Sequence, residues 1–379
     1  MERSVELGRL ISPATTVRCG NNSYPVLSMT MRNGLVFQEK KFKKVIASKD
    51  TSDYKVVYRN QLVISFPIDE GVLATQRITE AGIVSPAYGI WDIDQTQILP
   101  EYLEYALRCD RAIQYYKAKL RGSTARRRSL PTPTLLSFHV PLPDIEKQHE
   151  ILSQIHRVRS IIEHREEQIN KLDDITKARF VEMFGDINTN DRGWDVQPLG
   201  ELCTIVRGGS PRPIEDYLGG DVPWIKIGDA TEGESIYLHS TKEHIIQEGV
   251  KRSRLVKSGS LIFANCGVSL GFARIITFDG CIHDGWLAME DIDPRLDKVF
   301  LLQALNQMTK HFREIAPAGT QPNLNTAIMK AYKQIIPPME LQKSYIAFVT
   351  QVDKSKVVVQ KALEEAQLLF DSLMQTYFG

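Results

Sequence analysis

The chain has 379 residues, 42% of them hydrophobic and 25% charged, with a formal net charge of +1. This length exceeds that of one ordinary domain, and the composition is typical of a folded rather than a disordered protein. There is no run of 18 apolar residues and no apolar leader, so we expect neither a membrane span nor a signal peptide; the five scattered cysteines predict a reduced, cytoplasmic protein.

The charge is unevenly distributed along the chain. Residues 1–143 carry 20 basic and 13 acidic side chains, a net charge of +7, whereas residues 186–337 carry 16 and 19, a net charge of −3. A basic segment suggests a polyanionic partner such as nucleic acid. The second segment would need a local basic patch to bind the same partner.

Each half of the chain begins with short β-type runs punctuated by Gly, Asn and Asp and continues with one helical stretch. The expected strands are Pro25–Met29, Leu62–Phe66 and Gly82–Ile93 in the first half, and Val222–Ile227, Ser260–Ala264 and Ala273–Phe278 in the second. The expected helices are Pro100–Leu120 and Asp297–Ile315. A polar loop and a short apolar segment ending in prolines follow in both halves. The fold class is therefore α+β, with two similar domains.

Each half ends in a long helical segment that lacks internal Gly and Pro, over residues 144–185 and 338–379. Apolar residues recur at alternating spacings of four and three, which is the pattern of a coiled-coil seam. Helices of about 37 residues would be roughly 55 Å long and would need a partner along that length. The other long helix is the expected partner; the alternative is that each helix packs separately on its own domain. The expected packing residues are Ile155, Val158, Ile162, Ile169, Leu172, Val349, Val352, Val359 and Leu363.

The two halves are an internal repeat. A shift of 194 positions places Phe184-Gly185 on Phe378-Gly379 without a gap across the long helices. The expected organisation is a first domain over 1–143, a helix over 144–185, a second domain over 186–337 and a second helix over 338–379. A protein with two like halves usually binds a target with two like halves.

No motif for catalysis stands out. The sequence lacks a G-x-x-x-x-G-K-[ST] phosphate loop, a G-x-G-x-x-G after a strand, H-E-x-x-H and G-x-S-x-G. We therefore expect no catalytic residues, no metal site and no cofactor in this chain. Two other interpretations stay open: an enzyme with unrecognised motifs, and an interaction adaptor that uses its coiled coil and has no role on DNA.

Basic and amide side chains on loops are the candidates for binding DNA. Arg and Lys suit phosphate oxygens, Arg also forks onto guanine, and amide side chains suit adenine; the alternative is that these loops are simply solvated. The candidates are Lys40, Lys41, Lys43, Lys44, Arg77, Ser123, Thr124, Arg126, Arg127, Arg128, Arg207, Gly209, Ser210, Arg212, Lys226, Arg252, Arg254, Thr320, Gln321 and Asn323.

Together, these features resemble the specificity subunit of type I restriction–modification enzymes, and the resemblance covers essentially the whole chain. The duplicated order of the motifs is the most specific part of it. The residues that carry the resemblance are Val140–Gln148, Ile336–Gln342, Arg207–Pro211, Gly319–Leu324, Phe184-Gly185 and Phe378-Gly379.

The resemblance implies that each globular segment is a target recognition domain that reads one half of a bipartite double-stranded DNA site. It implies that the two helices pack antiparallel, with pseudo-twofold symmetry, set the spacing of the half-sites and dock two methyltransferase subunits. Restriction subunits can join such assemblies. S-adenosylmethionine, ATP and Mg would then belong to the partner subunits.

Overall fold

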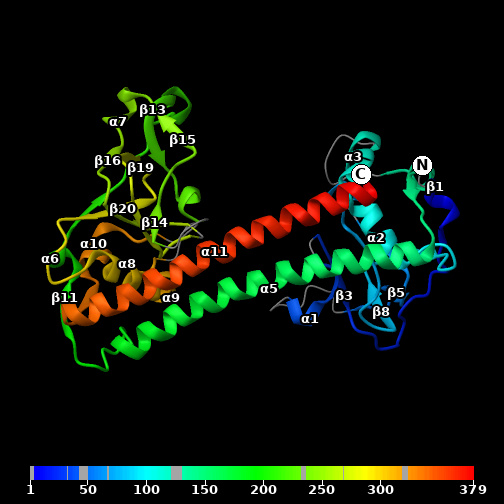
Figure 1. The fold of residues 1–379 in the computed structure, drawn as a ribbon, viewed down its shortest axis with the longest axis horizontal. Helices are drawn as coiled ribbons and strands as arrows, with labels where there is room; N and C mark the ends of the chain where they lie inside the picture. The colour runs from blue at the N-terminus through cyan, green and yellow to red at the C-terminus, as the bar shows by residue number, and fades with distance from the viewer. Residues whose placement is uncertain are drawn as a thin grey trace. The chain divides into compact units, whose positions relative to one another are not determined.

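The computed structural model describes residues 4–31, 33–41, 50–65, 68–120, 130–231, 236–267, 269–317 and 323–379. The chain forms two compact units (Figure 1): the first contains Met1–His164 with Leu363–Gly379, and the second contains Arg165–Ala362. Each unit therefore includes one globular part and one part of each long helix. None of the described helices combines the length and the apolarity that a membrane crossing requires.

The first unit has several small antiparallel sheets covered by two helices. Its largest sheet has the order β2-β9-β6-β7, and the pairs β3-β4, β5-β8 and β1-β10 complete it. The strands are β1 (Ser4–Glu6), β2 (Ile11–Pro13), β3 (Leu27–Thr30), β4 (Gly34–Phe37), β5 (Lys55–Tyr58), β6 (Leu62–Ile64), β7 (Leu73–Thr75), β8 (Ala81–Val84), β9 (Gly89–Ile93) and β10 (His139–Pro141). The helices are α1 (Gln38–Lys41), α2 (Pro100–Arg108), α3 (Asp110–Lys119) and α4 (Thr132–Leu136), with 3-10 turns at Leu7–Arg9 and Ile68–Glu70.

The second unit follows the same plan with larger sheets. One sheet has the order β12-β20-β17-β18-β14, another has the order β15-β13-β19-β16, and β11 pairs with β21. The strands are β11 (Asp195–Pro198), β12 (Thr204–Arg207), β13 (Leu218–Ile225), β14 (Tyr237–Leu238), β15 (Glu243–Ile245), β16 (Arg254–Val256), β17 (Leu261–Ala264), β18 (Ala273–Ile276), β19 (Gly280–Ile282), β20 (Trp286–Glu290) and β21 (Lys333–Ile336). The helices are α6 (Leu199–Leu202), α7 (Gln247–Val250), α8 (Lys298–Gln307), α9 (Thr309–Ile315) and α10 (Thr326–Ala331), with 3-10 turns at Ile214–Tyr217 and Ile227–Ala230.

Both helices predicted before the polar loops are broken in two, which corrects the sequence-based expectation. The break between α2 and α3 is at Cys109, whose backbone is extended and whose thiol donates to the carbonyl of Ala106 at 3.2 Å. The break between α8 and α9 follows Gln307, and the Thr309 hydroxyl donates to the carbonyl of Asn306 at 2.8 Å. In both places a side chain satisfies a backbone carbonyl that a continuous helix would have bonded.

The expected strand Gly82–Ile93 is also two strands, β8 and β9. The amide of Tyr88 donates to the carbonyl of Ser85 at 3.1 Å and closes a turn between them. Pro86 lies inside that turn, where the lack of an N–H leaves no strand hydrogen bond unmade.

The two long helices are α5 (Ile145–Phe184) and α11 (Met339–Phe378), each of 40 residues. Their bounds fall within the predicted helical segments, while the four-segment domain boundaries stay a prediction. The last residues of each helix are buried in the globular core of the other repeat. Phe378, at the end of α11, is fully buried in the first unit against Tyr102, and Phe184, at the end of α5, is fully buried in the second unit against Phe300.

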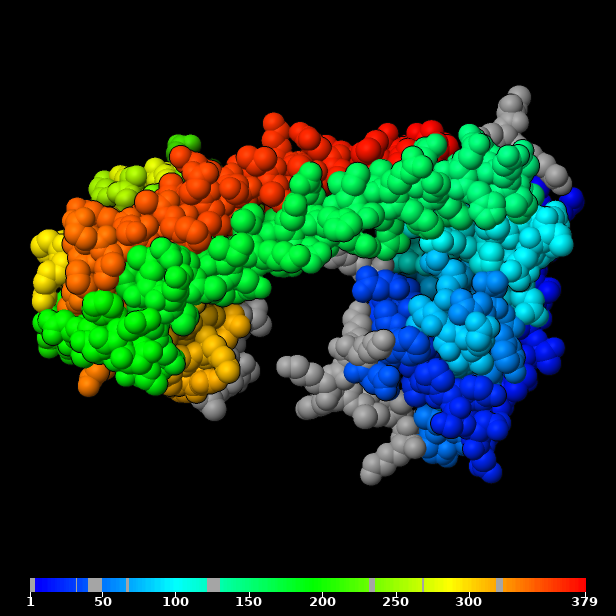
Figure 2. Space-filling model, turned by 60° about the horizontal axis from the view of Figure 1, so that its bottom comes forward, coloured from blue at the N-terminus to red at the C-terminus, as the bar shows by residue number. Residues whose placement is uncertain are grey.

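The helices pack on each other within both units, where they lie side by side (Figure 2). In the first unit, Val158 and Ile162 form a buried cluster with Ala366, and Leu363 and Phe370 pack against it. In the second unit, Asp173 pairs with Lys356 at 2.7 Å, and the Tyr345 hydroxyl donates to the carbonyl of Thr176 at 3.3 Å. In the first unit the Tyr377 hydroxyl also donates to Gln154 Oε1 at 2.9 Å, so a lower position on α5 pairs with a higher position on α11 than in the Val158–Ala366 cluster. Partner numbers therefore fall on one helix as they rise on the other, and the pairing is antiparallel in each unit.

The predicted seam residues are the less exposed positions of the helices. Ile155, Val158, Ile162, Val349 and Val352 are buried, and Ile169, Leu172, Val359 and Leu363 are half-buried. Ile155 and Val349 pack into the globular cores of their units rather than into a cluster between the helices alone.

Candidate nucleic-acid interface

The loop after β12 in the second unit is held against the start of β20. β12 pairs antiparallel with β20, from Thr204 opposite Glu290 to Arg207 opposite Leu287. This register brings the loop beside residues 283–286. The amide of Gly208 donates to the carbonyl of Trp286 at 2.9 Å, and the amide of Gly209 donates to the carbonyl of Ile282 at 3.0 Å.

Both glycines are required by close backbone contacts. A Cβ atom on Gly208 would lie 2.2 Å from the carbonyl oxygen of His283, and one on Gly209 would lie 2.9 Å from that of Arg252. The Ser253 hydroxyl also donates to the carbonyl of Gly209 at 2.8 Å. The loop is therefore fixed to β19 and to the segment that precedes β16.

Asp284 organises the side chains of this loop. Its Oδ1 accepts hydrogen bonds from the Ser210 hydroxyl at 2.9 Å and pairs with His283 Nε2 at 3.0 Å, and its Oδ2 lies 3.3 Å from Arg212 Nη2. Its backbone carbonyl accepts from Arg207 Nε at 3.1 Å. Partial burial would raise the pKa of Asp284, but His283, Ser210 and the two arginines outweigh it, and that pKa lies below its ordinary value.

His283 is held in one tautomer. Its Nδ1 accepts from the amide of Gly285 at 2.9 Å, so the ring proton lies on Nε2, which faces Asp284. Burial, with help from Lys226, Arg212 and Arg207, lowers the pKa of His283 against the opposing effect of Asp284. At neutral pH the ring is therefore an uncharged donor to the carboxylate.

A pocket of about 330 Å³ opens beside Asp284. The Trp224 ring packs on His283 at a centroid distance of 5.6 Å, and Trp224 Nε1 is a buried donor without a hydrogen-bond partner among the described residues. The pocket is lined by Ser210, Pro211, Arg212, Pro213, Ile214, Trp224 and His283.

Further cations lie on segments next to the Arg207–Arg212 loop. The Lys226 ammonium pairs with Glu243 and lies 5.2 Å from the centre of the Trp224 ring. The Arg252 guanidinium lies 5.4 Å from the centre of the Tyr217 ring, and Arg254 is exposed on β16. We call the following five residues the basic patch: Arg207, Arg212, Lys226, Arg252 and Arg254. With the carboxylates of Asp284 and Glu243, the patch has a net charge of +3 in a segment of net charge −3.

Six predicted candidates of the second unit, the five patch residues and Ser210, thus lie on this loop or in or beside strands β13 and β16. The amide of Gly209 holds the loop to Ile282. Asn323, by contrast, bonds to a residue outside this loop: its Oδ1 accepts from Nδ2 of the buried Asn265 at 3.1 Å. Thr320 and Gln321 lie outside the described residues.

Most candidates of the first unit cannot be placed. Lys40 and Lys41 end α1, with side chains outside the described part. The candidates that lie wholly outside the described residues are Lys43, Lys44, Ser123, Thr124, Arg126, Arg127 and Arg128.

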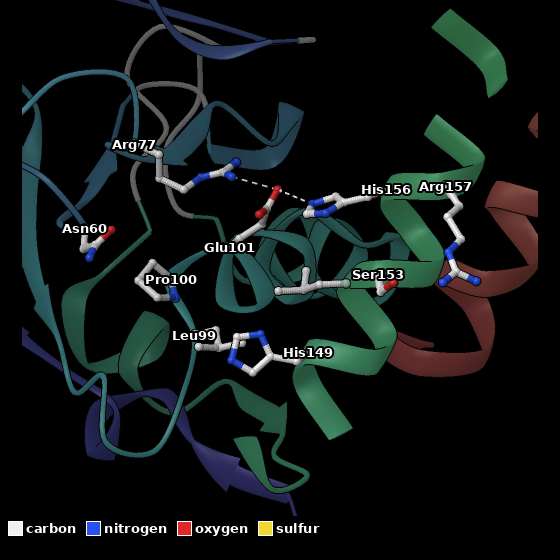
Figure 3. A pocket seen from close by; sticks show the side chains of 10 residues that line it. Asn60, Arg77, Leu99, Pro100, Glu101, His149, Ser153, His156 and Arg157 are labelled. Atoms are coloured by element: carbon white, nitrogen blue, oxygen red, sulfur yellow. Dashed lines mark ion pairs between the residues drawn. The ribbon is translucent and has the colours of Figure 1, made fainter. Parts of the chain in front are cut away.

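Arg77 is the described candidate of the first unit, and its charge is already matched. Its guanidinium lies 2.7 Å from Glu101 Oε1 and 3.7 Å from Glu104 Oε2, and His156 Nε2 lies 2.9 Å from the same Glu101 oxygen. Figure 3 shows Arg77 and His156 pointing toward Glu101 from opposite sides, in a groove of about 540 Å³ between α2 and α5. These ion pairs give Arg77 a structural role at the base of α5, so a DNA contact by this residue stays a prediction.

The sequence-based search missed His283, Asp284 and Trp224. An aspartate in an acidic segment does not stand out, and its partner Ser210 is 74 positions away. Within the described residues, no group of three His, Cys, Asp or Glu side chains is arranged to hold a metal ion.

Comparison with known proteins identifies the domain. Residues 191–367, which include the basic patch, match the family model of the type I restriction modification DNA specificity domain. Two curated relatives come from Methanocaldococcus jannaschii. The type I restriction enzyme MjaIX specificity subunit is 23% identical over 305 residues, 74% of this chain and 69% of the relative. The putative MjaX specificity subunit is 20% identical over 294 residues, 72% of this chain and 66% of the relative.

Solved structures share the fold across the whole chain. A chain from a structure of type I R-M complex assembly and conformational transition matches with a TM-score of 0.58 and 18% identity, covering 99% of this chain and 97% of that chain. The type I restriction–modification S subunit from M. genitalium matches with a TM-score of 0.55 and 14% identity, covering 100% of this chain and 96% of that chain. The duplicated fold and the matched domain define a DNA specificity protein. Residues 191–367 thus match a type I restriction modification DNA specificity domain, and most of the chain is similar to specificity subunits of type I restriction enzymes.

Proposed function

We propose that this chain selects the DNA sequence on which a type I restriction–modification complex acts, with one globular part reading each half of a bipartite site. The basic patch of the second unit carries this proposal, because it supplies concentrated positive charge where the segment as a whole is acidic. The net charge of +7 over residues 1–143 supplies the same attraction in the first unit.

Two methyltransferase subunits are the proposed partners of the long helices. Ile175 on α5 and Leu369 on α11 occupy equivalent positions of the repeat, and they are 48% and 51% exposed. One therefore lies in each unit. Leu368 beside Leu369 and Val358 on α11 are 70% and 69% exposed. Large apolar side chains at repeated exposed positions favour two copies of one partner.

Catalysis belongs to the partners in this proposal. The methyltransferase subunits would hold S-adenosylmethionine, and restriction subunits, where they join, would use ATP and Mg. This chain contributes charge, hydrogen-bond donors and a frame that orients the DNA.

The test is methylation mapping in cells that express the methyltransferase subunit with or without this chain. We expect one bipartite motif to be methylated only when the chain is present. Methylation that is independent of the chain would contradict the proposal. DNA methylation or cleavage by the purified chain alone would support the enzyme alternative instead.

The basic patch has its own test in the reconstituted complex. Replacing Arg254 with Gln should weaken DNA binding and reduce the slope of log affinity against log salt by about one, because one phosphate contact is lost. Lys310→Gln is the matched control, since its side chain is 91% exposed on α9 and lies outside the patch. Equal slopes for the wild type and Arg254→Gln would show that Arg254 does not contact a DNA phosphate.

A further inference from the structure

Arg212 combines exposure with anchoring. Its side chain is 80% exposed, yet one edge of its guanidinium is held by Asp284, with Nη2 lying 3.3 Å from Oδ2. A guanidinium has five N–H donors in one plane, so an anchored edge leaves others free to donate outward. A planar fork held in one orientation is the geometry that pairs with two acceptors at once.

The anchor is itself fixed from several sides. Asp284 accepts from Ser210 and His283, and Arg207 donates to its backbone carbonyl. Ser210 lies on the loop that Gly208 and Gly209 fasten to β19. Little freedom therefore remains to be lost when Arg212 meets a ligand, which favours recognition over loose attraction.

The other cations of the basic patch have different environments. Lys226 is a point charge paired with Glu243, and Arg252 lies against the Tyr217 ring. Arg254 has no anchoring side-chain contact among the described residues. These arrangements suit phosphate oxygens, which need positive charge but little directional order.

We propose that Arg212 reads a guanine in the half-site bound by the second unit, and that Asp284 is the residue that positions it. This inference rests on the proposed DNA-reading function. Guanine presents the O6 and N7 acceptors side by side in the major groove, and an arginine fork is their most frequent partner. A lysine at the same position would keep the charge but lose the two parallel donors.

The decisive variant is Arg212→Lys in the full chain, co-expressed with its methyltransferase subunit and followed by methylation mapping. We expect discrimination for guanine to fall roughly 5- to 150-fold at one position of one half-site. The other half-site and the spacer should be unchanged. Asp284→Asn should relax the same single position, whereas a merely structural role would lower methylation at all positions together.

Lys257→Gln is the matched control, because Lys257 is also an exposed cation held by an aspartate, Asp279, at 2.7 Å. It should leave the motif unchanged. An unchanged motif for Arg212→Lys, or equal weakening at every sequence, would overturn the inference; the second result would assign Arg212 to a phosphate. A wild-type complex that methylates no specific motif would instead contradict the proposed function itself.

Discussion

In each unit, a buried glutamine near the start of the long helix makes hydrogen bonds to the segment that precedes α2 or α8 in sequence. Gln342 Oε1 accepts from the amide of Asp297 at 2.8 Å, and its Nε2 donates to the carbonyls of Arg295 at 2.8 Å and Pro337 at 2.7 Å. Gln148 makes the same three bonds in the first unit, to Leu99, Gln97 and Pro143. Both side chains are fully buried. Both N–H donors and the oxygen of each amide are thus hydrogen-bonded where it enters a core.

Replacing Gln342 with Leu should destabilise the second unit. One buried N–H and two carbonyls would lose their partner, which should cost about 2–4 kcal/mol. Chemical denaturation followed by tryptophan fluorescence would measure this loss of stability, because three of the four tryptophans lie in residues 165–362 and only Trp91 lies outside them. Gln351→Leu, at an exposed position of the same helix, should change stability by less than about 0.5 kcal/mol. Equal effects of the two substitutions would refute this role.

At the scale of the element, polar residues interrupt the apolar seam between α5 and α11 and define its register. Lys356 is only 17% exposed and pairs with Asp173 on the other helix. Arg274 of β18 faces the same region: burial lowers its pKa to about 10, against the opposing effects of Asp353 and Asp173. A one-turn slip of either helix would leave these cations without their carboxylates, and this disfavours other registers.

Replacing Asp173 with Asn should therefore weaken the helix pair in the second unit. Because Asp173 is 44% exposed, we expect a loss of about 1–2 kcal/mol rather than the larger cost of a fully buried pair. Asp174→Asn is the neighbouring control, since Asp174 is 76% exposed and its Lys177 contact is 3.5 Å. Thermal denaturation of both variants would check the difference. A loss as large for Asp174→Asn would show that net charge, not pairing, is responsible.

At the scale of the whole molecule, both long helices pass from one unit into the other, after residues 164 and 362. Any function that depends on both units at once therefore depends on helix length. The dependence on helix length follows from the duplication, because each repeat contributes one long helix and its globular part packs around the end of the other long helix.

Seven residues inserted into both helices, after residues 164 and 362, should keep the seam in register and lengthen each helix by about 10.5 Å. The spacer of the methylated motif should then grow by about three base pairs, at ~3.4 Å per base pair. An insertion in one helix alone should disrupt pairing and abolish methylation. Methylation mapping would measure both, and an unchanged spacer in the double insertion would rule out a ruler role.

The candidate site was only partly predictable from the sequence. The Arg207–Arg212 loop was selected because it holds two glycines, which permit close backbone approach, and two arginines, and the structure shows both arginines contacting Asp284. Arg77 was selected for its charge, but the sequence did not predict its carboxylate partners, Glu101 and Glu104, which come from α2. A DNA contact by Arg77 stays a prediction.

The sequence by itself determined the duplication, the two long helices and their apolar seam, because the helices and the seam depend on a periodic apolar pattern that each helix carries along its own length. The antiparallel direction was implied only by the family resemblance. Only the tertiary structure decided where α2 and α8 end, how Asp284 anchors Arg212 and which cations remain available. Those features depend on side chains that are distant along the chain and meet only after the sheets have formed, such as Ser210 and Asp284. Local patterns report the elements, whereas the site is made of contacts between them.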